Sequence, residues 1–299
     1  MDGKLVLFDA STRLLRAETT LRATDADGPA FSRDGRLIAV TEEGSLTIIE
    51  ASTGSIVKRL PLAARHYAPA FVSADAVLAS DGKESIDRID LASGSVTKVL
   101  DPRRNEGERL VKFFFDPHGR DIGVAAVGAA HLRLFRADGT ILRELDAERR
   151  DIVDVVFAAT RPELYVASSD FQLRGQVVEV FHLERGERIA TIPLTTFPNS
   201  LALSPDESAI AVACSTLRTF ELPYEGRGQR LHGHRQAVDG CAFDAAGRLW
   251  SSDIGGGNFL FGLADRISVI HWGQVIAEGT PGELMADKWV ARSALGGVA

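Results

Sequence analysis

The stretch LHGHRQAVDGCAFDAAGRLWSSD, residues 231–253, contains two short strands joined by a turn. The first strand ends at Phe243, the turn falls at Ala246-Gly247, and the second strand ends at Asp253. This pattern is half of a four-stranded sheet. Residues 2–18, at the start of the chain, have the strand-turn-strand pattern of the missing half. We therefore predict that residues 2–18 complete the sheet of residues 235–253, which would leave no open strand edge there.

The same unit recurs when the chain is aligned on the aromatic residue or leucine that ends a short strand. The aligned residues are Phe31, Phe71, Phe115, Phe157, Leu203 and Phe243. Their spacing of 40 to 46 residues is typical of the four-stranded blades of a β-propeller. Turn residues follow each of them, as in Arg33-Asp34-Gly35, and a strand of small residues comes next, as in LIAVT at 37–41. The alternation in these second strands predicts that they are half-buried.

The outer half of each unit also repeats, as an apolar strand, a polar corner, a glycine turn and a second alternating strand. The copies cover residues 46–60, 86–100, 132–145 and 178–192, with turn glycines at Gly54, Gly94, Gly139 and Gly186. We predict an all-β, six-bladed β-propeller over residues 1–253, closed by its N- and C-terminal strands, with seven blades as the alternative.

Three short motifs carry a resemblance to a known family over residues 1–253. They are Gly233-His234, Ser251-Ser252-Asp253 and the F-S-x-D-G run at 31–35. With them the chain resembles the WD-repeat family, although pairs such as Phe8-Asp9 replace most of the family's Trp-Asp pairs. The resemblance implies a non-catalytic scaffold for protein–protein interaction, and it implies that His234 is structural, bonding within its blade.

Composition excludes some classes of partner. The net charge of −7 and the lack of a basic run argue against binding to nucleic acid. The two cysteines, Cys214 and Cys241, are expected to be buried free thiols of a reducing compartment. The N-terminus lacks a signal-peptide pattern, and the longest weakly polar run, residues 122–130, is too short to cross a membrane. We expect a soluble, cytoplasmic protein.

Catalytic motifs are missing from the sequence. It contains no Walker A loop, no G-x-S-x-G elbow, no H-E-x-x-H and no C-x-x-C. Asp34, Asp75, Asp138 and Asp206 lie at turns, where their carboxylates are expected to accept backbone hydrogen bonds. We predict no catalytic residue, no metal site and no cofactor.

A candidate binding site comes from the residues just before each innermost strand, which should surround the mouth of the central channel. These residues are Asp27, His66, Tyr67, Lys112, Asp154, Asn199 and Asp239. Polar and aromatic side chains of this kind suit a protein or peptide partner. A ring of oxygen donors could alternatively hold a cation, although the positive charge of Lys112 disfavours one. A third interpretation is an ordinary polar surface without a ligand, because any exposed rim is polar.

The repeat ends after Asp253. Residues 254–257 read as a glycine-rich joint, and residues 258–299 as a tail with a short helix, a hairpin from Ile267 to Ala277 and a capped helix beginning at Thr280. The runs at 263–267, 273–281 and 294–297 resemble the C-terminus of the ATPase subunit of branched-chain amino-acid ABC importers. No nucleotide site accompanies this resemblance. The resemblance provides one functional alternative, an accessory component of an amino-acid ABC importer. A second alternative, independent of the tail, is a propeller enzyme with a metal or hydrolytic site at the channel mouth.

Overall fold

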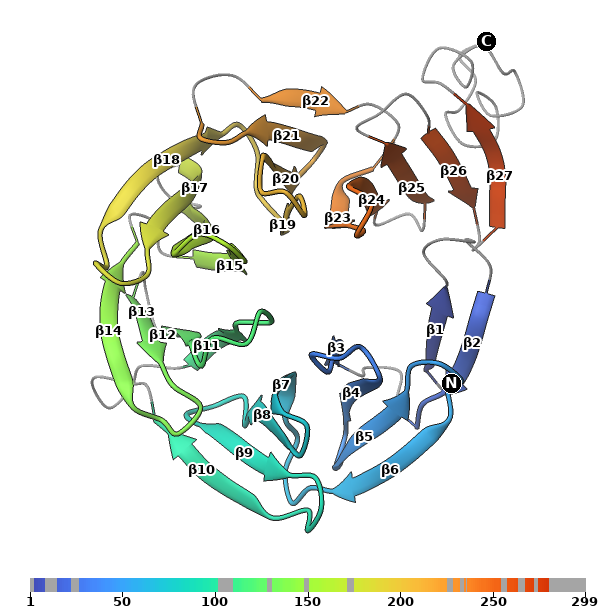
Figure 1. Ribbon diagram of the computed structural model, residues 1–299, viewed down its shortest axis with the longest axis vertical. Helices are drawn as coiled ribbons and strands as arrows, with labels where there is room; N and C mark the ends of the chain where they lie inside the picture. The colour runs from blue at the N-terminus through green and yellow to red at the C-terminus, as the bar shows by residue number, and fades with distance from the viewer. Residues whose placement is uncertain are drawn as a thin grey trace. The chain divides into compact units, whose positions relative to one another are not determined.

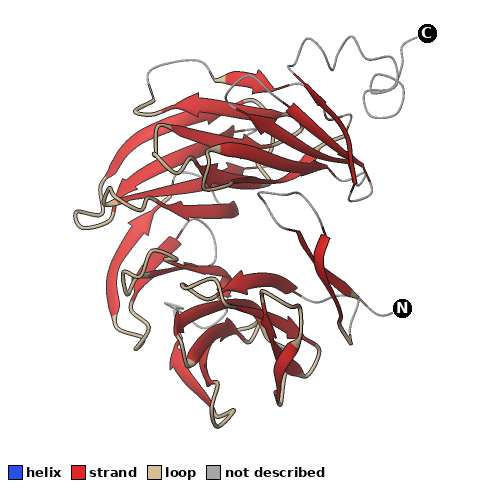
Figure 2. Cartoon of the chain, turned by 45° about the vertical axis from the view of Figure 1, so that its right-hand side comes forward, coloured by secondary structure: helices blue, strands red, loops and turns tan. Residues whose placement is uncertain are grey.

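The structure is a computed structural model that describes residues 3–8, 15–22, 27–101, 110–127, 131–147, 151–170, 175–224, 228–231, 234, 236–253, 257–262, 267–271 and 274–279. Their regular secondary structure is β throughout (Figure 2). Among them we find no helix with the length and hydropathy needed to span a membrane. The chain divides into two compact units, Met1–Arg150 and Asp151–Ala299.

The first unit contains three four-stranded antiparallel sheets in which each strand pairs with the next one along the chain (Figure 1). Blade 1 is made of β3 (Asp27–Phe31), β4 (Leu37–Glu42), β5 (Ser45–Glu50) and β6 (Ile56–Pro61). Blade 2 is made of β7 (Tyr67–Ser73), β8 (Ala76–Ser80), β9 (Ile86–Asp90) and β10 (Val96–Leu100). Blade 3 is made of β11 (Leu110–Phe115), β12 (Gly123–Val127), β13 (His131–Phe135) and β14 (Ile141–Asp146).

The second unit continues the repeat with three further sheets. Blade 4 is made of β15 (Asp151–Phe157), β16 (Glu163–Asp170), β17 (Gly175–His182) and β18 (Arg188–Leu194). Blade 5 is made of β19 (Ser200–Leu203), β20 (Ala209–Ala213), β21 (Leu217–Glu221) and β22 (Gln229–Leu231). Blade 6 has five strands, β23 (Val238–Phe243), β24 (Arg248–Asp253), β25 (Gly257–Gly262), β26 (Ile267–His271) and β27 (Gln274–Gly279).

The predicted pairing of the chain's start with residues 235–253 is wrong. The strand that pairs with β24 on its outer side is β25, with Arg248 opposite Gly262 and Ser252 opposite Asn258. Residues 4–20 instead form a two-stranded sheet of β1 (Lys4–Phe8) and β2 (Leu15–Thr20). The physical reason is loop closure, because three residues separate β24 from β25 whereas residues 2–18 lie at the far end of the chain.

The tail prediction is also corrected in part. The sequence suggested a short helix from residue 258, but residues 257–262 form strand β25. The predicted hairpin is confirmed as β26 and β27, which pair from Ile267 opposite Gly279 to His271 opposite Gln274. The helix expected from Thr280 lies outside the described residues.

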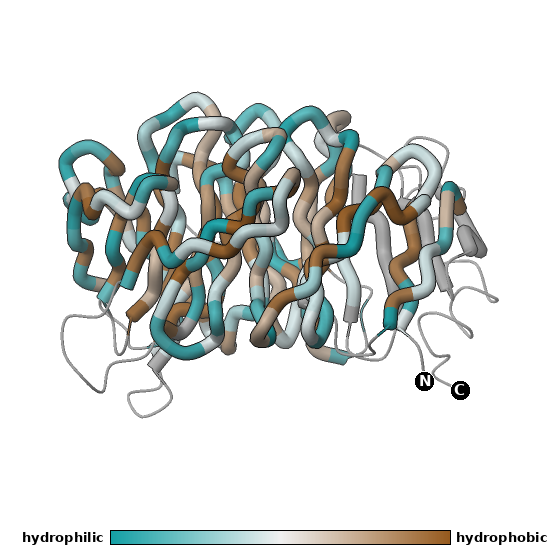
Figure 3. The backbone as a smooth tube through the Cα atoms, turned by 90° about the horizontal axis from the view of Figure 1, so that it is seen from below, coloured by the Kyte–Doolittle hydropathy of each residue, from teal (hydrophilic) through white to brown (hydrophobic). Residues whose placement is uncertain are grey.

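The small-residue second strands are buried on both faces, so the prediction that they are half-buried is wrong. Every residue of β8, β12 and β20 is buried. Alanine and valine at these positions let neighbouring blades approach closely, and the apolar cores lie between adjacent sheets. Figure 3 shows the consequence along the chain, with apolar residues concentrated within strands and hydrophilic residues at turns.

Local turn chemistry matches its predictions except at Asp75. Gly54, Gly94, Gly139 and Gly186 all have φ between +72° and +89°. Asp206 accepts hydrogen bonds from Ser204 Oγ at 2.7 Å and from the backbone nitrogen of Ser208 at 3.1 Å, and the bond from Ser204 contributes most to lowering the pKa of Asp206 to about 2. Asp34 and Asp138 also accept hydrogen bonds from backbone nitrogens in their turns, as predicted. Among the residues that the structure describes, Asp75 accepts from the hydroxyl of Ser73 and not from a backbone nitrogen.

Sheet β1–β2 packs on blade 1. Leu5 and Leu7 lie against a buried cluster that includes Ile38 and Val40, and Thr19 Oγ1 donates a hydrogen bond of 2.5 Å to the carbonyl of Gly54. The N-terminal strands therefore cover a face of the first blade. Elsewhere in the chain, Cys214 and Cys241 are free thiols; Cys214 is buried as expected, whereas Cys241 is partly exposed.

Candidate functional site

Of the predicted channel-mouth residues, two precede the first strand of their blade as expected, and the other five lie within it. Asp27 and Tyr67 are the first residues of β3 and β7, and Asp154 lies within β15. His66 and Asn199 directly precede β7 and β19, and the other two lie within β11 and β23: Lys112 and Asp239. The side chain of Asp27 is outside the described residues.

In the second unit these side chains join neighbouring blades. Asp154 Oδ2 accepts a hydrogen bond of 2.7 Å from the backbone nitrogen of Leu201 in β19. Asn199 Nδ2 donates one of 2.7 Å to the carbonyl of Val238 in β23. Both side chains therefore hold consecutive innermost strands together, and their role in binding a partner stays a prediction. Asp239 Oδ1 accepts a hydrogen bond of 2.6 Å from Ser252 Oγ within blade 6.

His66 is likewise a structural residue. Its ring is buried, with Nε2 3.0 Å from Asp87 Oδ2 and Nδ1 3.0 Å from the carbonyl of Ala64. Ser85 Oγ donates to the other oxygen of Asp87 at 2.8 Å. The hydrogen bond to Asp87 raises the pKa of His66, although burial opposes the shift. A buried, fully engaged imidazole is unsuited to contacting a partner.

His234 has a comparable place in blade 6. Its Nε2 lies 2.6 Å from Ser251 Oγ in β24. The prediction that this histidine bonds within its own blade is confirmed.

Tyr67 and Lys112 remain as surface candidates. The guanidinium of Arg65 lies over the ring of Tyr67, 4.9 Å from its centroid, and the edge of the same ring lies against Gly82. Lys112 is exposed on β11. Their role in binding stays a prediction.

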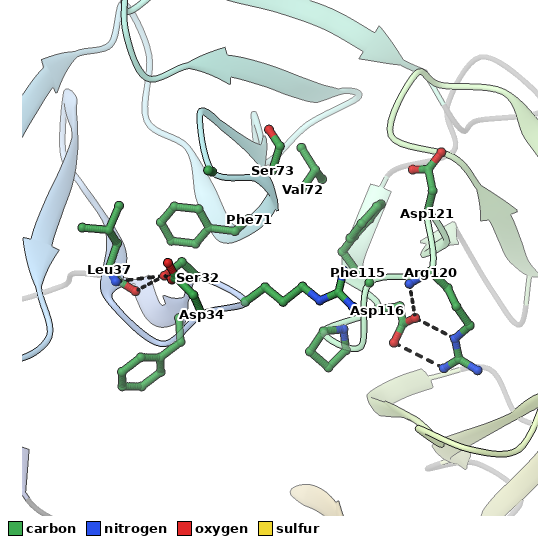
Figure 4. A pocket seen from close by; sticks show the side chains of 15 residues that line it. Ser32, Asp34, Leu37, Phe71, Val72, Ser73, Phe115, Asp116, Arg120 and Asp121 are labelled. Carbon is green, nitrogen blue, oxygen red and sulfur yellow. Dashed lines mark hydrogen bonds and ion pairs between the residues drawn. The ribbon is translucent and has the colours of Figure 1, made fainter.

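A pocket of about 820 Å³ lies toward the opposite ends of the innermost strands, within the first unit (Figure 4). Its walls come from the turns between the first and second strands of blades 1, 2 and 3. Strand β7 lies beside both β3 and β11, so three consecutive blades build one concavity. This is the size of pocket that ordinarily accommodates a ligand or an anchoring side chain.

Three phenylalanines at equivalent places in the repeat line this pocket: Phe31, Phe71 and Phe115. Phe31 is 57% exposed, and the other two are half-buried. Phe115 is held from behind by the buried Phe135, with ring centroids 6.2 Å apart. A Cβ at Gly123 would overlap both rings, so this glycine permits their packing.

The carboxylates of the pocket are already engaged within the protein. Asp116 is buried and accepts a hydrogen bond of 2.7 Å from Arg120 Nε, which Figure 4 shows beside the pocket. Asp34 accepts from Ser32 Oγ at 2.7 Å, and this bond contributes most to lowering its pKa. Asp121 accepts a hydrogen bond of 2.8 Å from the backbone nitrogen of Ala137. These acids stabilise turns.

Arg33 differs from these residues. Its side chain is exposed and makes no hydrogen bond or ion pair with any residue that the structure describes. Its guanidinium lies against Gly119 in the β11–β12 turn, at a place that a Cβ would occupy. The arginine of blade 1 therefore reaches the wall formed by blade 3, and it brings a positive charge to a pocket lined with aromatic rings.

Sequence reasoning missed this pocket, although its phenylalanines were the landmarks of the repeat. The same alignment position holds Phe157 in blade 4, where only 3% of the residue is exposed. The same position of the repeat is therefore a core residue in one blade and a surface residue in another. A usable signal was the Ser-Arg-Asp-Gly turn after Phe31, which puts a long cation next to an aromatic ring.

A metal site would need several convergent ligands. Within the described part of the chain, no group of three or more His, Cys, Asp or Glu side chains is placed to hold a metal ion.

No known protein family matches the sequence, and no curated protein matches it either. Among solved structures, the chain is similar to the β-propeller domain of Cps50 (Swd1) from Myceliophteria thermophila, with a TM-score of 0.73 and 14% identity over 85% of this chain and 88% of that one. It is also similar to Kuenenia stuttgartiensis hydrazine synthase, with a TM-score of 0.66 and 14% identity over 82% of this chain and 77% of that one. The chain therefore has the β-propeller fold, as predicted. These comparisons lend no support to the importer-ATPase resemblance of the tail.

Proposed function

We propose that this protein is a non-catalytic, cytoplasmic interaction module that binds a protein partner in the pocket between the turns of blades 1, 2 and 3. The observation that carries the proposal is the set of three phenylalanines that face one concavity from three consecutive blades. Aromatic side chains in a concave, partly desolvated place concentrate binding energy at protein interfaces.

The partner class follows from charge and from the fold. A net charge of −7 disfavours a polyanionic nucleic acid. The WD-repeat resemblance implies binding to proteins, and the chain shares the propeller fold of the Cps50 (Swd1) domain. A side chain or short segment of a partner protein is therefore the proposed occupant.

The predicted channel mouth is the alternative location, and it lies toward the other end of the same strands. Tyr67 begins β7, whereas Phe71 lies close to its end. Asp154, Asn199 and His66 are each hydrogen-bonded within their own unit, so these side chains are less available to a partner. The pocket is the better-supported site for this reason.

The proposal can be tested by selecting displayed random linear peptides on the immobilised full-length protein. Selected peptides should lose about 1–2 kcal/mol of binding free energy with Phe71→Ala. Val57→Ala is the matched control, because Val57 is an apolar residue of the same unit that is 58% exposed and lies outside the pocket. Its binding should equal that of the wild type.

Tyr67→Ala distinguishes the two ends of β7. Peptides that bind Tyr67→Ala normally but fail on Phe71→Ala support the pocket. The reverse result would move the site to the channel mouth, and unchanged binding to both variants would place it elsewhere in the protein.

A further inference from the structure

The charged residues of the pocket restrict the chemistry of its ligand more than the apolar lining does. This inference rests on the proposed function. Three carboxylates lie on the pocket wall, and each is paired with a donor of the protein itself: Asp34, Asp116 and Asp121. The guanidinium of Arg120 is paired with Asp116 through Nε at 2.7 Å and Nη2 at 3.3 Å. Arg120 therefore neutralises Asp116, and Arg136 lies 3.7 Å from Asp121. Asp34 accepts from neutral groups and keeps its negative charge, so Arg33 is the cation that a bound carboxylate would meet.

Arg33 is the cation that remains available at the pocket, judged by the residues described there. It is exposed and engages none of them by a hydrogen bond or an ion pair. Gly119 has φ +86° and no side chain, and this lets the guanidinium approach the backbone of blade 3. Residue 119 thus makes room for the arginine to extend across the pocket.

The surroundings strengthen any ion pair made there. Phe31 and Phe71 line the same pocket. A bound segment that covers these rings would exclude water from the guanidinium, and a lower local dielectric strengthens an ion pair. Guanidinium is also planar and donates two parallel hydrogen bonds to a carboxylate, a geometry that lysine cannot reproduce.

We infer that the partner segment presents a carboxylate next to an apolar side chain, with Arg33 binding the carboxylate and Phe31, Phe71 and Phe115 receiving the apolar group. Arg33 is then the specificity-determining residue of the site. The acidic protein as a whole repels anions, so recognition of a carboxylate depends on this local charge.

Two fluorescein-labelled peptide pools provide the test. Both contain a fixed leucine flanked by randomised neutral residues; the position next to leucine is glutamate in one pool and glutamine in the other. Binding to the full-length protein is measured by anisotropy. We expect the glutamate pool to bind about three- to tenfold more tightly than the glutamine pool, and this preference to disappear in Arg33→Gln. In Arg33→Glu, a third pool with lysine at that position should bind in preference to the glutamate pool.

The outcomes separate this inference from the proposed function. Equal binding of both pools to the wild type, abolished by Phe71→Ala, would keep the proposed function and overturn the role of Arg33. No binding of any pool would remove the pocket as a peptide site and the inference with it. Arg33-dependent binding of a single-stranded oligonucleotide pool in place of the peptides would also overturn the inference. Thermal melting should be the same for both Arg33 variants and the wild type, since Arg33 bonds to no described residue.

Discussion

At the scale of single residues, Gly123 keeps the wall of the pocket in place. An added Cβ would overlap the rings of Phe135 and Phe115, and Gly123 is buried. We expect Gly123→Ala to lower the free energy of unfolding by about 1–3 kcal/mol, as overpacking of a core does. Urea unfolding would measure it. Gly28→Ala is the control, because nothing lies within 4 Å of its Cβ position, and its effect should stay within about 0.5 kcal/mol.

His66 provides a prediction about pH. Its pKa is raised above the ordinary value of 6.5, mainly by the hydrogen bond to Asp87. A raised folded-state pKa means that the protonated ring stabilises the fold fully below pH 6.5, and that this stabilisation is lost as pH rises through the folded pKa. The melting temperature of the wild type should exceed that of His66→Gln by more at acidic than at alkaline pH. A difference that stays constant across this range would contradict the assignment.

The candidate site could be predicted from sequence only in part, and the reason is visible in individual residues. The alignment located Phe31, Phe71 and Phe115 at equivalent positions, because blades repeat. It could not show that Phe31 is 57% exposed while Phe157 is 3% exposed, because burial depends on the neighbouring blade. The hydrogen bonds of Asp154 and Asn199 could not be predicted for a related reason, since their partners are backbone groups of the next blade.

At the scale of elements, Glu207 ties the turn between β19 and β20 to the turn between β15 and β16. Its carboxylate accepts hydrogen bonds from the backbone nitrogens of Ala159 and Thr160, from Thr160 Oγ1 at 2.7 Å and from Arg161 Nε at 3.1 Å. Burial raises the pKa of Glu207, but these bonds outweigh burial and the net shift is downward. The carboxylate therefore links blades 4 and 5.

Substituting this residue should loosen the link between the two blades. Glu207→Ala removes the acceptor of four hydrogen bonds, but Ala159 and Thr160 are exposed, so water can replace part of what is lost. We expect the free energy of unfolding to fall by about 1.5–3 kcal/mol, the usual contribution of hydrogen bonds to a charged group. Glu187→Ala is the control, because Glu187 is exposed and its ion pair with Arg185 is also exposed, so its loss should cost less than about 1 kcal/mol. Equal urea midpoints for the two variants would show that Glu207 does not link the blades.

The lowered pKa of Glu207 also makes its contribution to stability depend on pH. Its stabilising contribution is present above the ordinary carboxyl pKa and is lost as pH falls through the lower, folded value. The stability difference between the wild type and Glu207→Gln should therefore shrink in acid. This trend is opposite to the alkaline loss expected for His66.

The strands could be predicted where the residues that begin and end them act locally. Turn glycines with positive φ and aspartate caps such as Asp206 lie within a few residues of the groups they satisfy, so the sequence pattern places the strands well. Burial of β8, β12 and β20 was underestimated, because the residues on both of their faces are buried. Local alternation does not reveal that second covering layer.

At the scale of the whole molecule, the hardest feature to predict was which segment completes a sheet. The strand patterns at 2–18 and at 267–277 were both recognised, and each could in principle supply outer strands to β23 and β24. The choice depends on chain connectivity and on competing backbone partners. The three-residue connection to β25 favours the tail, whereas β1 and β2 pair with each other and pack on blade 1.

This pairing predicts that the tail is needed for folding of the last blade. A chain ending at Asp253 would keep β23 and β24 but expose the backbone edge of β24 that β25 otherwise pairs with from Arg248 to Ser252. An unpaired strand edge promotes association, and a two-stranded sheet is marginal by itself. We therefore expect the truncated protein to aggregate or to lose its cooperative thermal transition.

Hydrogen exchange of the full-length protein tests the same pairing without a deletion. Strand β25 has a neighbour on each side, whereas β27 is the last strand of its sheet. Amides of residues 258–261 should therefore exchange more slowly, on average, than those of residues 275–278, because edge strands leave part of their backbone groups unpaired. Exchange of residues 258–261 at the rate of a free peptide, together with unchanged melting of the chain ending at Asp253, would show that blade 6 is complete without the tail. The outer partner of β24 would then have to come from elsewhere, and residues 2–18 would again be the first segment to examine.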